Sequence, residues 1–512
     1  MKIYYFCPHQ IIYLQMKRLL AGIITFLTIS IPTFAQTTEE IANDPTFYGS
    51  IIGICARTID GQSLIEINSE KMLVPASNMK LISTGAALNA FGPDFCYETS
   101  IAYDGEISDG ILHGNLYIVG GGDPTIASKD SIATPLERTF EQWAKFVKDA
   151  GIQQINGYII GDGRYFDGMA EEPTWLWNDI GTYYGTGTTG LMFYENMQSF
   201  SVSAGSSVGA PVNIRPYYPE TPWMDFRYAC ATGEKGTGDK LYMYTSDLAP
   251  IAEIRGTFGV DRAAKRVDWS NKFPEYTCAY YFCNYLSEKG ITCSEGAADY
   301  KLNKVEASEE RTVLGSTYSP KLERIIFETN HASNNLFAET LFRTLGKVLN
   351  SDSSYESSSA ALKGVLNNLG IDTEKGAKIQ DGSGLSRQNY ISPGFICSFL
   401  VAMAETENFC TYILSLPIPG GNGTLEYNMK GHPLSLRNRI RVKSGSMNGV
   451  RCYSGYILPS GYTLETLVNE QLTEEVKNKT IVFSIMTNNC TAPTWKVRPM
   501  LDKVMADLAL YN

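Results

Sequence analysis

One serine in the sequence lies three residues before a lysine, Ser77 before Lys80. Positions three apart on a helix share one face, so the lysine amine can reach the serine hydroxyl. A lysine accepts the proton of such a hydroxyl only when burial and a neighbouring cation bring its pKa from about 10.4 down to roughly 7 to 8. The pair predicts nucleophilic catalysis by Ser77 with Lys80 as general base, and Lys443 is a candidate for the second cation.

Two further short patterns hold groups that could complete this site. Ser333 and Asn335 form a Ser-x-Asn sequence, and Lys443–Ser446 reads Lys-Ser-Gly-Ser at the end of a predicted strand. A cation beside hydroxyls can bind a carboxylate, and a glycine lets the backbone come close to a ligand. Each pattern alone also fits an ordinary interpretation, such as a solvated strand end. Their order, on a helix, a helix–loop junction and a strand, favours one shared site.

A competing motif is the Gly-x-Ser-x-Gly sequence at residues 205–209, which could belong to a serine hydrolase with a histidine base. Such a motif needs a helix directly after the serine, because the helix N-terminus helps to build the oxyanion hole. Here Pro211 and Pro216 follow, which predicts a turn. The chain also has only four histidines, so the lysine-based site is favoured.

The elements expected around these residues place Ser77 at a helix N-terminus. Strands over 51–57 and 64–68 are joined at Asp60-Gly61, a strong hairpin signal. A helix then begins after Pro75 and ends at Gly92 and Pro93.

Between about residues 96 and 305, short apolar runs alternate with Gly-rich and Pro-rich turns, which predicts mostly β structure. Two helices are expected within it, near 136–150 and 275–289. The remainder predicts helices over 319–348, 356–369, 393–405 and 495–510, and strands over 439–443, 449–458 and 481–487.

Length, charge and the N-terminus limit the class of protein. With 512 residues, 44% of them apolar, the chain can form three to four domains with buried cores. Its net charge of −11 excludes a general attraction to nucleic acid. The apolar run 19–31 follows Lys17 and Arg18 and precedes a small-x-small site ending at Ala35. It is too short for a comfortable membrane span, so it predicts a signal peptide over 1–35, cleaved after Ala35, and export to the periplasm.

The cysteines show no Cys-x-x-Cys spacing, so no zinc or redox motif is expected. In an exported chain of this size they predict buried thiols with one or two disulfides.

Together the three motifs resemble those of the penicillin-binding protein and serine β-lactamase superfamily. The chain looks most like the class C low-molecular-mass penicillin-binding proteins, which are D-alanyl-D-alanine carboxypeptidase/endopeptidases. Ser333 comes 256 positions after Ser77, and this family carries two extra domains in that gap. Four further sequence segments also resemble this family: Gly120–Thr125, Trp175–Asp179, Ser333–Leu341 and Asp381–Arg387.

The resemblance implies an α/β (α+β) serine penicillin-recognising fold, an antiparallel sheet flanked by helices with two mostly-β inserted domains. The catalytic domain is expected over 36–97 and 308–512. One β-rich insert is expected over 98–121 and 205–307, with a second insert nested within it at 122–204.

The resemblance also implies roles for the motif residues. Ser77 would attack the peptide carbonyl of D-Ala-D-Ala or of a D-Ala-containing cross-link, with Lys80 as base. Ser333 would pass a proton to the leaving nitrogen, while Asn335 would hold the substrate amide and Lys80. Peptidoglycan peptides and β-lactam antibiotics are the implied partners, and no metal or organic cofactor is required.

The third motif would bind the terminal carboxylate through Lys443, Ser444 and Ser446, with Gly445 between the two hydroxyls. The backbone N–H groups of Ser77 and Ser446 would form the oxyanion hole. The family commonly has Lys-Thr-Gly-Thr here. The hydroxyls remain in this chain and the methyls are lost, which would affect the rate and the affinity for β-lactams.

Arg387 matches the arginine that follows the Gly-Ser-Gly-Leu-Ser motif in this family, and it would contact the acidic end of a diamino-acid side chain. Asp162 is a candidate for the amino group of that side chain, with a solvated turn as the alternative. Asp381, Gly382 and Gly384 are expected to form a structural turn.

Two other functions compete with the peptidase. A β-lactamase or esterase on the same scaffold would need a dedicated deacylation base, which the sequence does not identify. A non-catalytic peptidoglycan-binding protein would be free to lose the motif residues, and all of them are intact.

Overall fold

The computed structural model describes residues 40–41, 43–306, 308–462 and 473–511, and the expected signal peptide lies outside them. The two ends of the described chain meet in an antiparallel five-stranded sheet of order β2-β1-β22-β21-β20. Its strands are β1 (Ile51–Thr58), β2 (Ser63–Ile67), β20 (Ile440–Met447), β21 (Val450–Ile457) and β22 (Ile481–Asn488). Strand β20, which carries the third motif, is therefore an edge strand.

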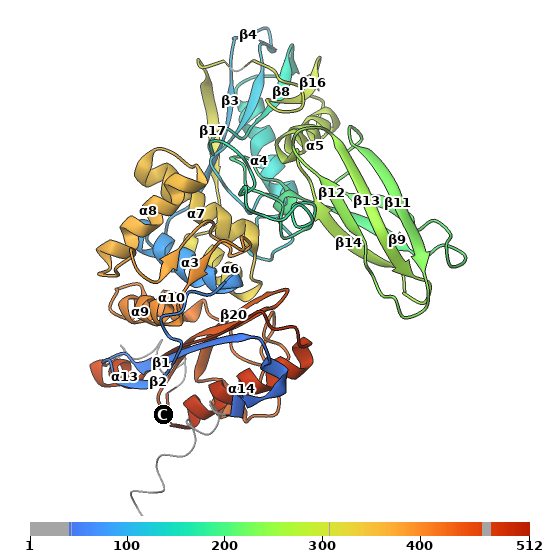
Figure 1. Ribbon diagram of the computed structural model, residues 1–512. Coiled ribbons are helices and arrows are strands. Elements are labelled where there is room, and N and C mark those ends of the chain that lie inside the picture. Colours follow the sequence, from blue (N-terminus) through green and yellow to red (C-terminus); the bar gives the residue numbers. More distant parts are fainter. Residues whose placement is uncertain (1–39, 42, 307, 463–472, 512) are drawn as a thin grey trace, which may run out of the picture.

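Helices cover both faces of this sheet (Figure 1). Helix α14 packs on one face and contributes to the apolar core there. Helix α9 packs on the other face against β1 and β22, and α3 lies in the helical layer beyond it. The helices of this part are α3 (Met79–Phe91), α6 (Leu322–His331), α7 (Asn335–Asn350), α8 (Tyr355–Asn368), α9 (Pro393–Ala404), α10 (Phe409–Leu414), α11 (Leu434–Arg437), α13 (Glu474–Lys479) and α14 (Thr494–Tyr511).

Helix α3 is the centre of the helical layer, and ten of its thirteen residues are buried. A 3-10 turn, η2 (Ala76–Asn78), leads into it and carries Ser77. The helix ends at Gly92, whose φ of 77° suits a residue without a Cβ and whose N–H donates to Leu88 O. The expected position of Ser77 at a helix N-terminus is confirmed.

The chain leaves the catalytic part after α3 and returns to it after β17. A five-stranded sheet of order β16-β8-β6-β3-β17 forms the base of this insert, with a four-stranded sheet, β15-β7-β5-β4, beside it. These elements are β3 (Glu98–Tyr103), β4 (Glu106–Ser108), β5 (Ile111–His113), β6 (Leu116–Gly120), β7 (Gln154–Ile155), β8 (Tyr158–Asp162), β15 (Thr292–Cys293), β16 (Gly296–Asp299) and β17 (Thr312–Tyr318), with helices α4 (Leu136–Asp149) and α5 (Pro274–Glu288). Both insert helices lie where the sequence predicts them.

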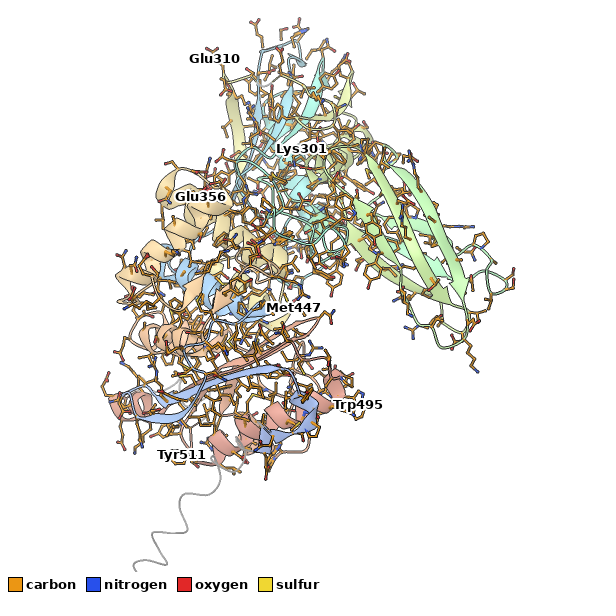
Figure 2. The ribbon with its side chains drawn as sticks, viewed as in Figure 1. Lys301, Glu310, Glu356, Met447, Trp495 and Tyr511 are labelled. Carbon is orange, nitrogen blue, oxygen red and sulfur yellow. The ribbon has the colours of Figure 1, made fainter. Side chains whose placement is uncertain are left out.

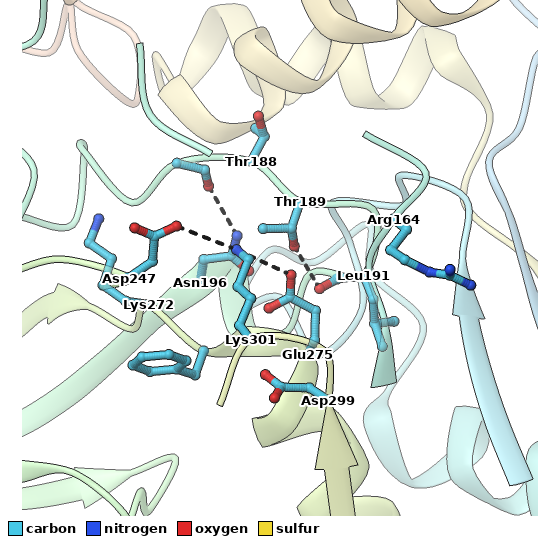
Figure 3. Close-up of polar contacts among 12 residues, drawn as sticks. Arg164, Thr188, Thr189, Leu191, Asn196, Asp247, Lys272, Glu275, Asp299 and Lys301 are labelled. Atoms are coloured by element: carbon cyan, nitrogen blue, oxygen red, sulfur yellow. Dashed lines mark hydrogen bonds and ion pairs between the residues drawn. The ribbon is translucent and has the colours of Figure 1, made fainter. Parts of the chain in front are cut away.

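A second β unit extends away from this base (Figure 1). It holds two three-stranded sheets, β10-β9-β14 and β11-β13-β12, packed around one apolar cluster. The strands are β9 (Met197–Ser203), β10 (Asn213–Tyr218), β11 (Asp225–Gly233), β12 (Tyr242–Thr245), β13 (Ile251–Gly259) and β14 (Lys265–Ser270). Lys301 pairs with Asp247 of this unit and with Glu275 of α5 (Figure 3).

The strand pairing differs from the expected boundaries of the two inserts. Strand β8 falls inside the expected nested segment 122–204, yet it pairs with β6 and β16 of the base sheet. Strand β9 begins before residue 205 and pairs with β10 and β14. The nested unit in the structure is thus Met197–Ser270. Local patterning shows that a segment is a strand and does not specify its partner, which explains the difference.

Two smaller expectations can be compared with the structure. The sequence at 205–209 lies in the turn between β9 and β10, as predicted, and a strand follows it where a hydrolase motif would need a helix. The ten cysteines of the described residues are all free thiols, which corrects the expectation of one or two disulfides. No helix within the described ranges has the length and apolar character that a membrane crossing requires.

Candidate active site

Lys80 lies at the centre of the site and joins two of the three motifs. Its Nζ is 3.0 Å from Ser77 Oγ, 2.6 Å from Asn335 Oδ1 and 2.8 Å from the Ser383 carbonyl oxygen. The side chain is completely buried. Burial lowers the pKa of Lys80 to about 7, against the opposing effect of the carboxyl groups of Glu339 and Asp381. The amine can therefore be neutral near neutral pH.

The second motif lies at the start of α7. Asn334 is the N-cap of this helix, and its Oδ1 accepts from Phe337 N. Ser333, just before it, has a φ of 58°, and its Oγ accepts a hydrogen bond of 2.9 Å from Lys443 Nζ. Asn335 donates from Nδ2 to the Tyr184 carbonyl oxygen at 2.8 Å, so both ends of its amide are used.

The third motif brings β20 against the turn that carries Ser77. Lys443 is buried, and burial together with Lys80 holds its pKa well below the usual range for lysine. Ser444 Oγ donates to Thr424 Oγ1 at 3.2 Å. A methyl group at Gly445 would lie 2.6 Å from the Pro75 carbonyl oxygen, so a glycine is needed for this close approach.

One cleft of about 1040 Å³ is lined by Ser77, Ser333, Asn335, Ser444 and Gly445. The two buried lysines, Lys80 and Lys443, are not among its lining residues. The cleft lies between the catalytic part and the insert, and Met447 at the tip of the β20–β21 hairpin marks its edge (Figure 2). Ser77 and Ser446, whose N–H groups are the expected oxyanion hole, both line it.

The loop that follows β18 (Ala377–Lys378) packs against Lys80 and contacts its amine. Asp381 accepts from Gly384 N at 2.8 Å and from Trp175 Nε1 at 2.9 Å. This agrees with the expected structural turn. The same loop also presents the Ser383 carbonyl to Lys80, a role that the sequence analysis missed, because a backbone acceptor has no side-chain signature.

Glu339 is a second residue that the sequence analysis missed. It is 1% exposed on α7, and its carboxylate accepts from Ser383 N at 2.8 Å and from Gly382 N at 3.2 Å. Burial and the nearby Asp381 raise the pKa of Glu339 to about 8. Glu339 lies within Ser333–Leu341, a segment that resembles the family, and this resemblance could have drawn attention to it.

The two residues expected to recognise a diamino-acid side chain lie apart. Arg387 lines the cleft and donates to the Asn448 carbonyl oxygen at 3.2 Å. Asp162 is not among the cleft-lining residues. It is buried on β8 and paired with Arg164 at 2.9 Å and Arg311 at 2.7 Å.

Asp179 is a carboxylate that does line the cleft. It accepts from Tyr184 OH at 3.1 Å. Burial raises the pKa of Asp179, and the nearby Arg387 opposes that shift. Asp179 belongs to Trp175–Asp179, a segment that resembles the family. That resemblance pointed to the segment and did not single out Asp179.

An antiparallel sheet between helical layers, with a serine and a buried lysine at a helix N-terminus, defines a serine enzyme of the penicillin-recognising type. The chain belongs to the D-Ala-D-Ala carboxypeptidase 3 (S13) family, whose model matches residues 34–507. The expected family and fold class are confirmed, and members of this family are serine-type carboxypeptidases.

Individual relatives agree with this assignment. The chain is 26% identical over 451 residues to a D-alanyl-D-alanine carboxypeptidase of Actinomadura sp., covering 84% of this chain and 80% of the relative. The crystal structure of penicillin binding protein 4 (dacB) from Haemophilus influenzae matches with a TM-score of 0.77 at 21% identity, over 93% of this chain and 99% of that one. A second structure of that protein, complexed with a β-lactam, matches with a TM-score of 0.72 at 20% identity, over the same shares of the two chains.

Proposed function

We propose that this protein is a D-Ala-D-Ala carboxypeptidase and D,D-endopeptidase that acts on peptidoglycan stem peptides through an acyl-enzyme on Ser77. The observation that carries the proposal is the position of Lys80 Nζ, buried and 3.0 Å from Ser77 Oγ. A neutral amine at that distance can take the proton of the hydroxyl as the oxygen attacks.

Acylation follows from these contacts. The Ser77 proton moves to Lys80 Nζ as Oγ bonds to the peptide carbonyl carbon, and the N–H groups of Ser77 and Ser446 stabilise the oxyanion. The C–N bond then breaks as Ser333 gives its proton to the leaving nitrogen. Lys443, which donates to Ser333 Oγ, stabilises the oxygen left behind until the proton held by Lys80 restores it.

Deacylation reverses the roles of the same groups. A water gives a proton to Lys80 as its oxygen attacks the ester carbonyl, and Ser77 Oγ takes that proton back when the C–O bond breaks. A β-lactam keeps its leaving group tethered and would remain at the acyl-enzyme stage. The β-lactam complex of the Haemophilus relative supports this partner.

Substrate recognition uses both sides of the cleft. Lys443, Ser444 and Ser446 bind the terminal carboxylate of the substrate. Arg387 and Asp179 line the same cleft with opposite charges. They suit the carboxylate and the amino group at the end of a diamino-acid side chain.

A fluorescent penicillin tests the proposal. The purified protein should form a covalent adduct, and Ser77→Ala should form none. An unlabelled wild-type protein, or equal labelling of the variant, would refute the assignment of Ser77. Release of D-alanine from a pentapeptide would separate a peptidase from a β-lactamase. Cleavage of a cross-linked muropeptide measures the endopeptidase activity.

Export to the periplasm is part of the same proposal, because the substrate is a wall polymer. The apolar run 19–31 and the small residues before Gln36 support a signal peptide that ends at Ala35. N-terminal sequencing of the protein recovered from the periplasm should begin at Gln36. A cytoplasmic protein that retains residues 1–35 would contradict it.

A further inference from the structure

A glutamate of the insert touches the second motif. Glu195 Oε2 accepts a hydrogen bond of 2.8 Å from Asn334 Nδ2, and its Oε1 accepts one of 2.7 Å from Ser128 Oγ. Glu195 also lines the catalytic cleft. Its carboxylate therefore bridges a loop of the insert and the residue between Ser333 and Asn335.

Asn334 links Glu195 to the first turn of helix α7. Its Oδ1 is used in the cap of α7 by Phe337 N, so Glu195 and the helix hold the two ends of one planar amide. The residue before it, Ser333, has the positive φ of 58° that turns its Oγ towards Lys443. A backbone of that kind persists when the surrounding contacts hold it.

The turn that carries Glu195 is itself held in an unusual conformation. Tyr194, Glu195 and Asn196 have successive φ values of 53°, 55° and 52°, which side chains with a Cβ rarely adopt. Asn196 fixes the turn, because its Oδ1 accepts from Phe193 N at 3.1 Å and its Nδ2 donates to Gly187 O at 3.0 Å. Figure 3 shows Asn196 next to the loop that carries Thr188 and Thr189. The insert thus presents the Glu195 carboxylate in one fixed direction.

We propose that Glu195 is a positioning residue for the second motif: through Asn334 it fixes the hydroxyl of Ser333 opposite Lys443. The proposal rests on the role of Ser333 in the proposed function. Through the Glu195–Asn334 contact, one loop of the insert helps to position a group of the catalytic site. The Tyr184 carbonyl, which accepts from Asn335, is a second such contact from the same insert.

Three variants separate this role from a general loss of structure. Glu195→Ala removes the acceptor for Asn334 and should lower the second-order rate of acylation by fluorescent penicillin about tenfold. For peptide hydrolysis kcat should fall, with KM nearly unchanged. Glu195→Gln should stay within about threefold of wild type, because its amide oxygen can accept from Asn334 and its NH₂ can donate to Ser128. Glu253→Ala, on β13 of the second β unit, is the matched control and should behave as wild type.

A double-mutant cycle tests whether Glu195 acts through Asn334. Asn334→Asp keeps a good helix cap and sets a carboxylate against Glu195, so it should also slow acylation. Adding Glu195→Gln should restore the rate, since the new amide can donate to that carboxylate. The rescue gives an answer even if Glu195→Ala does not fold.

The outcomes also separate this inference from the proposed function. If wild type is not labelled by the penicillin, the assignment of Ser77 fails. If wild type is labelled and Glu195→Ala reacts at the wild-type rate, the positioning role alone is overturned. An Asn334→Asp variant that Glu195→Gln does not rescue also overturns it.

Discussion

Lys80 has three neighbours for its amine, and their chemistry determines how it can act. Asn335 Oδ1 and the Ser383 carbonyl are acceptors only. A neutral amine has two N–H bonds for these oxygens and one lone pair, which is then directed at Ser77. The same two contacts that hold Lys80 thus orient it as a base.

The pH dependence of acylation follows from this arrangement. Burial lowers the pKa of Lys80 to about 7, and only the unprotonated amine can act as the base. The second-order rate of penicillin acylation should therefore rise as the pH passes through about 7 and level off above it. A rate measured between pH 5 and 9 that is flat, or that falls over this range, would contradict Lys80 as the base.

Arg387 allows a prediction about specificity. Arg387→Ala should raise KM about tenfold for a stem peptide whose diamino acid carries a free side-chain carboxylate, with little change in kcat. The same peptide with that carboxylate amidated serves as the control and should lose almost nothing. Equal losses on both peptides would show that Arg387 does not recognise the carboxylate.

At the residue scale, the sequence could predict the groups that act through their own side chains. Ser77, Lys80, Ser333 and Lys443 were predicted from type and spacing, and the structure places Lys80 beside Ser77 and Lys443 beside Ser333. Ser383 contacts Lys80 through its backbone carbonyl oxygen. That contact depends on the conformation of the loop, which residue types do not reveal. Asp162 was one of two open interpretations, a ligand for the amino group or a solvated turn residue, whereas its buried carboxylate is paired with two arginines.

At the scale of elements, the cleft depends on how closely β20 approaches η2. Gly445 is the contact point, because a Cβ there would lie 2.6 Å from Pro75 O. Gly445→Ala should push the strand away and lower the acylation rate at least tenfold. Gly364→Ala is a matched control on α8, where a Cβ meets nothing within 4 Å. It should keep full activity and stabilise the protein by about 0.5–1 kcal/mol in urea unfolding.

The contact of α6 with the insert should make stability depend on pH. Burial and the neighbouring carboxylate of Asp130 raise the pKa of Glu328 to about 7. A raised carboxyl pKa adds stability that is complete below the unfolded value near 4.5 and is lost as the pH rises through about 7.

Glu328→Gln should therefore reduce the fall in Tm between pH 5 and 8, with its largest gain over wild type at pH 8. Thermal unfolding followed by circular dichroism measures this. A parallel loss of Tm in both proteins would exclude Glu328 as its source.

Elements were predicted better than their pairing. The helices 136–150 and 275–289 could be located from periodicity, which is a local property. The partners of Tyr158–Asp162 lie up to about 140 residues away in sequence, and the alternation of side chains does not specify them.

At the scale of the whole molecule, a buried ion pair anchors the loop over the cleft. Lys272, which follows β14, lies 2.5 Å from Glu171 and donates to the Gly185 carbonyl oxygen at 3.2 Å. Lys272→Met would leave Glu171 buried without a partner and should destabilise the protein by about 3–5 kcal/mol. Urea unfolding measures the loss. The exposed Lys235→Met is the control, and equal stability of the two variants would contradict the role of the pair.

The order of the catalytic sheet has a consequence for the timing of activity. Strand β1 pairs with β22, more than 400 residues later in the chain, while the insert closes on itself where β3 pairs with β17. The insert can fold while the chain is still being made, whereas the sheet must wait for its last strands. Ser77 and Lys443 are brought together by that final step. The emerging chain is therefore inactive until β22 has been synthesised.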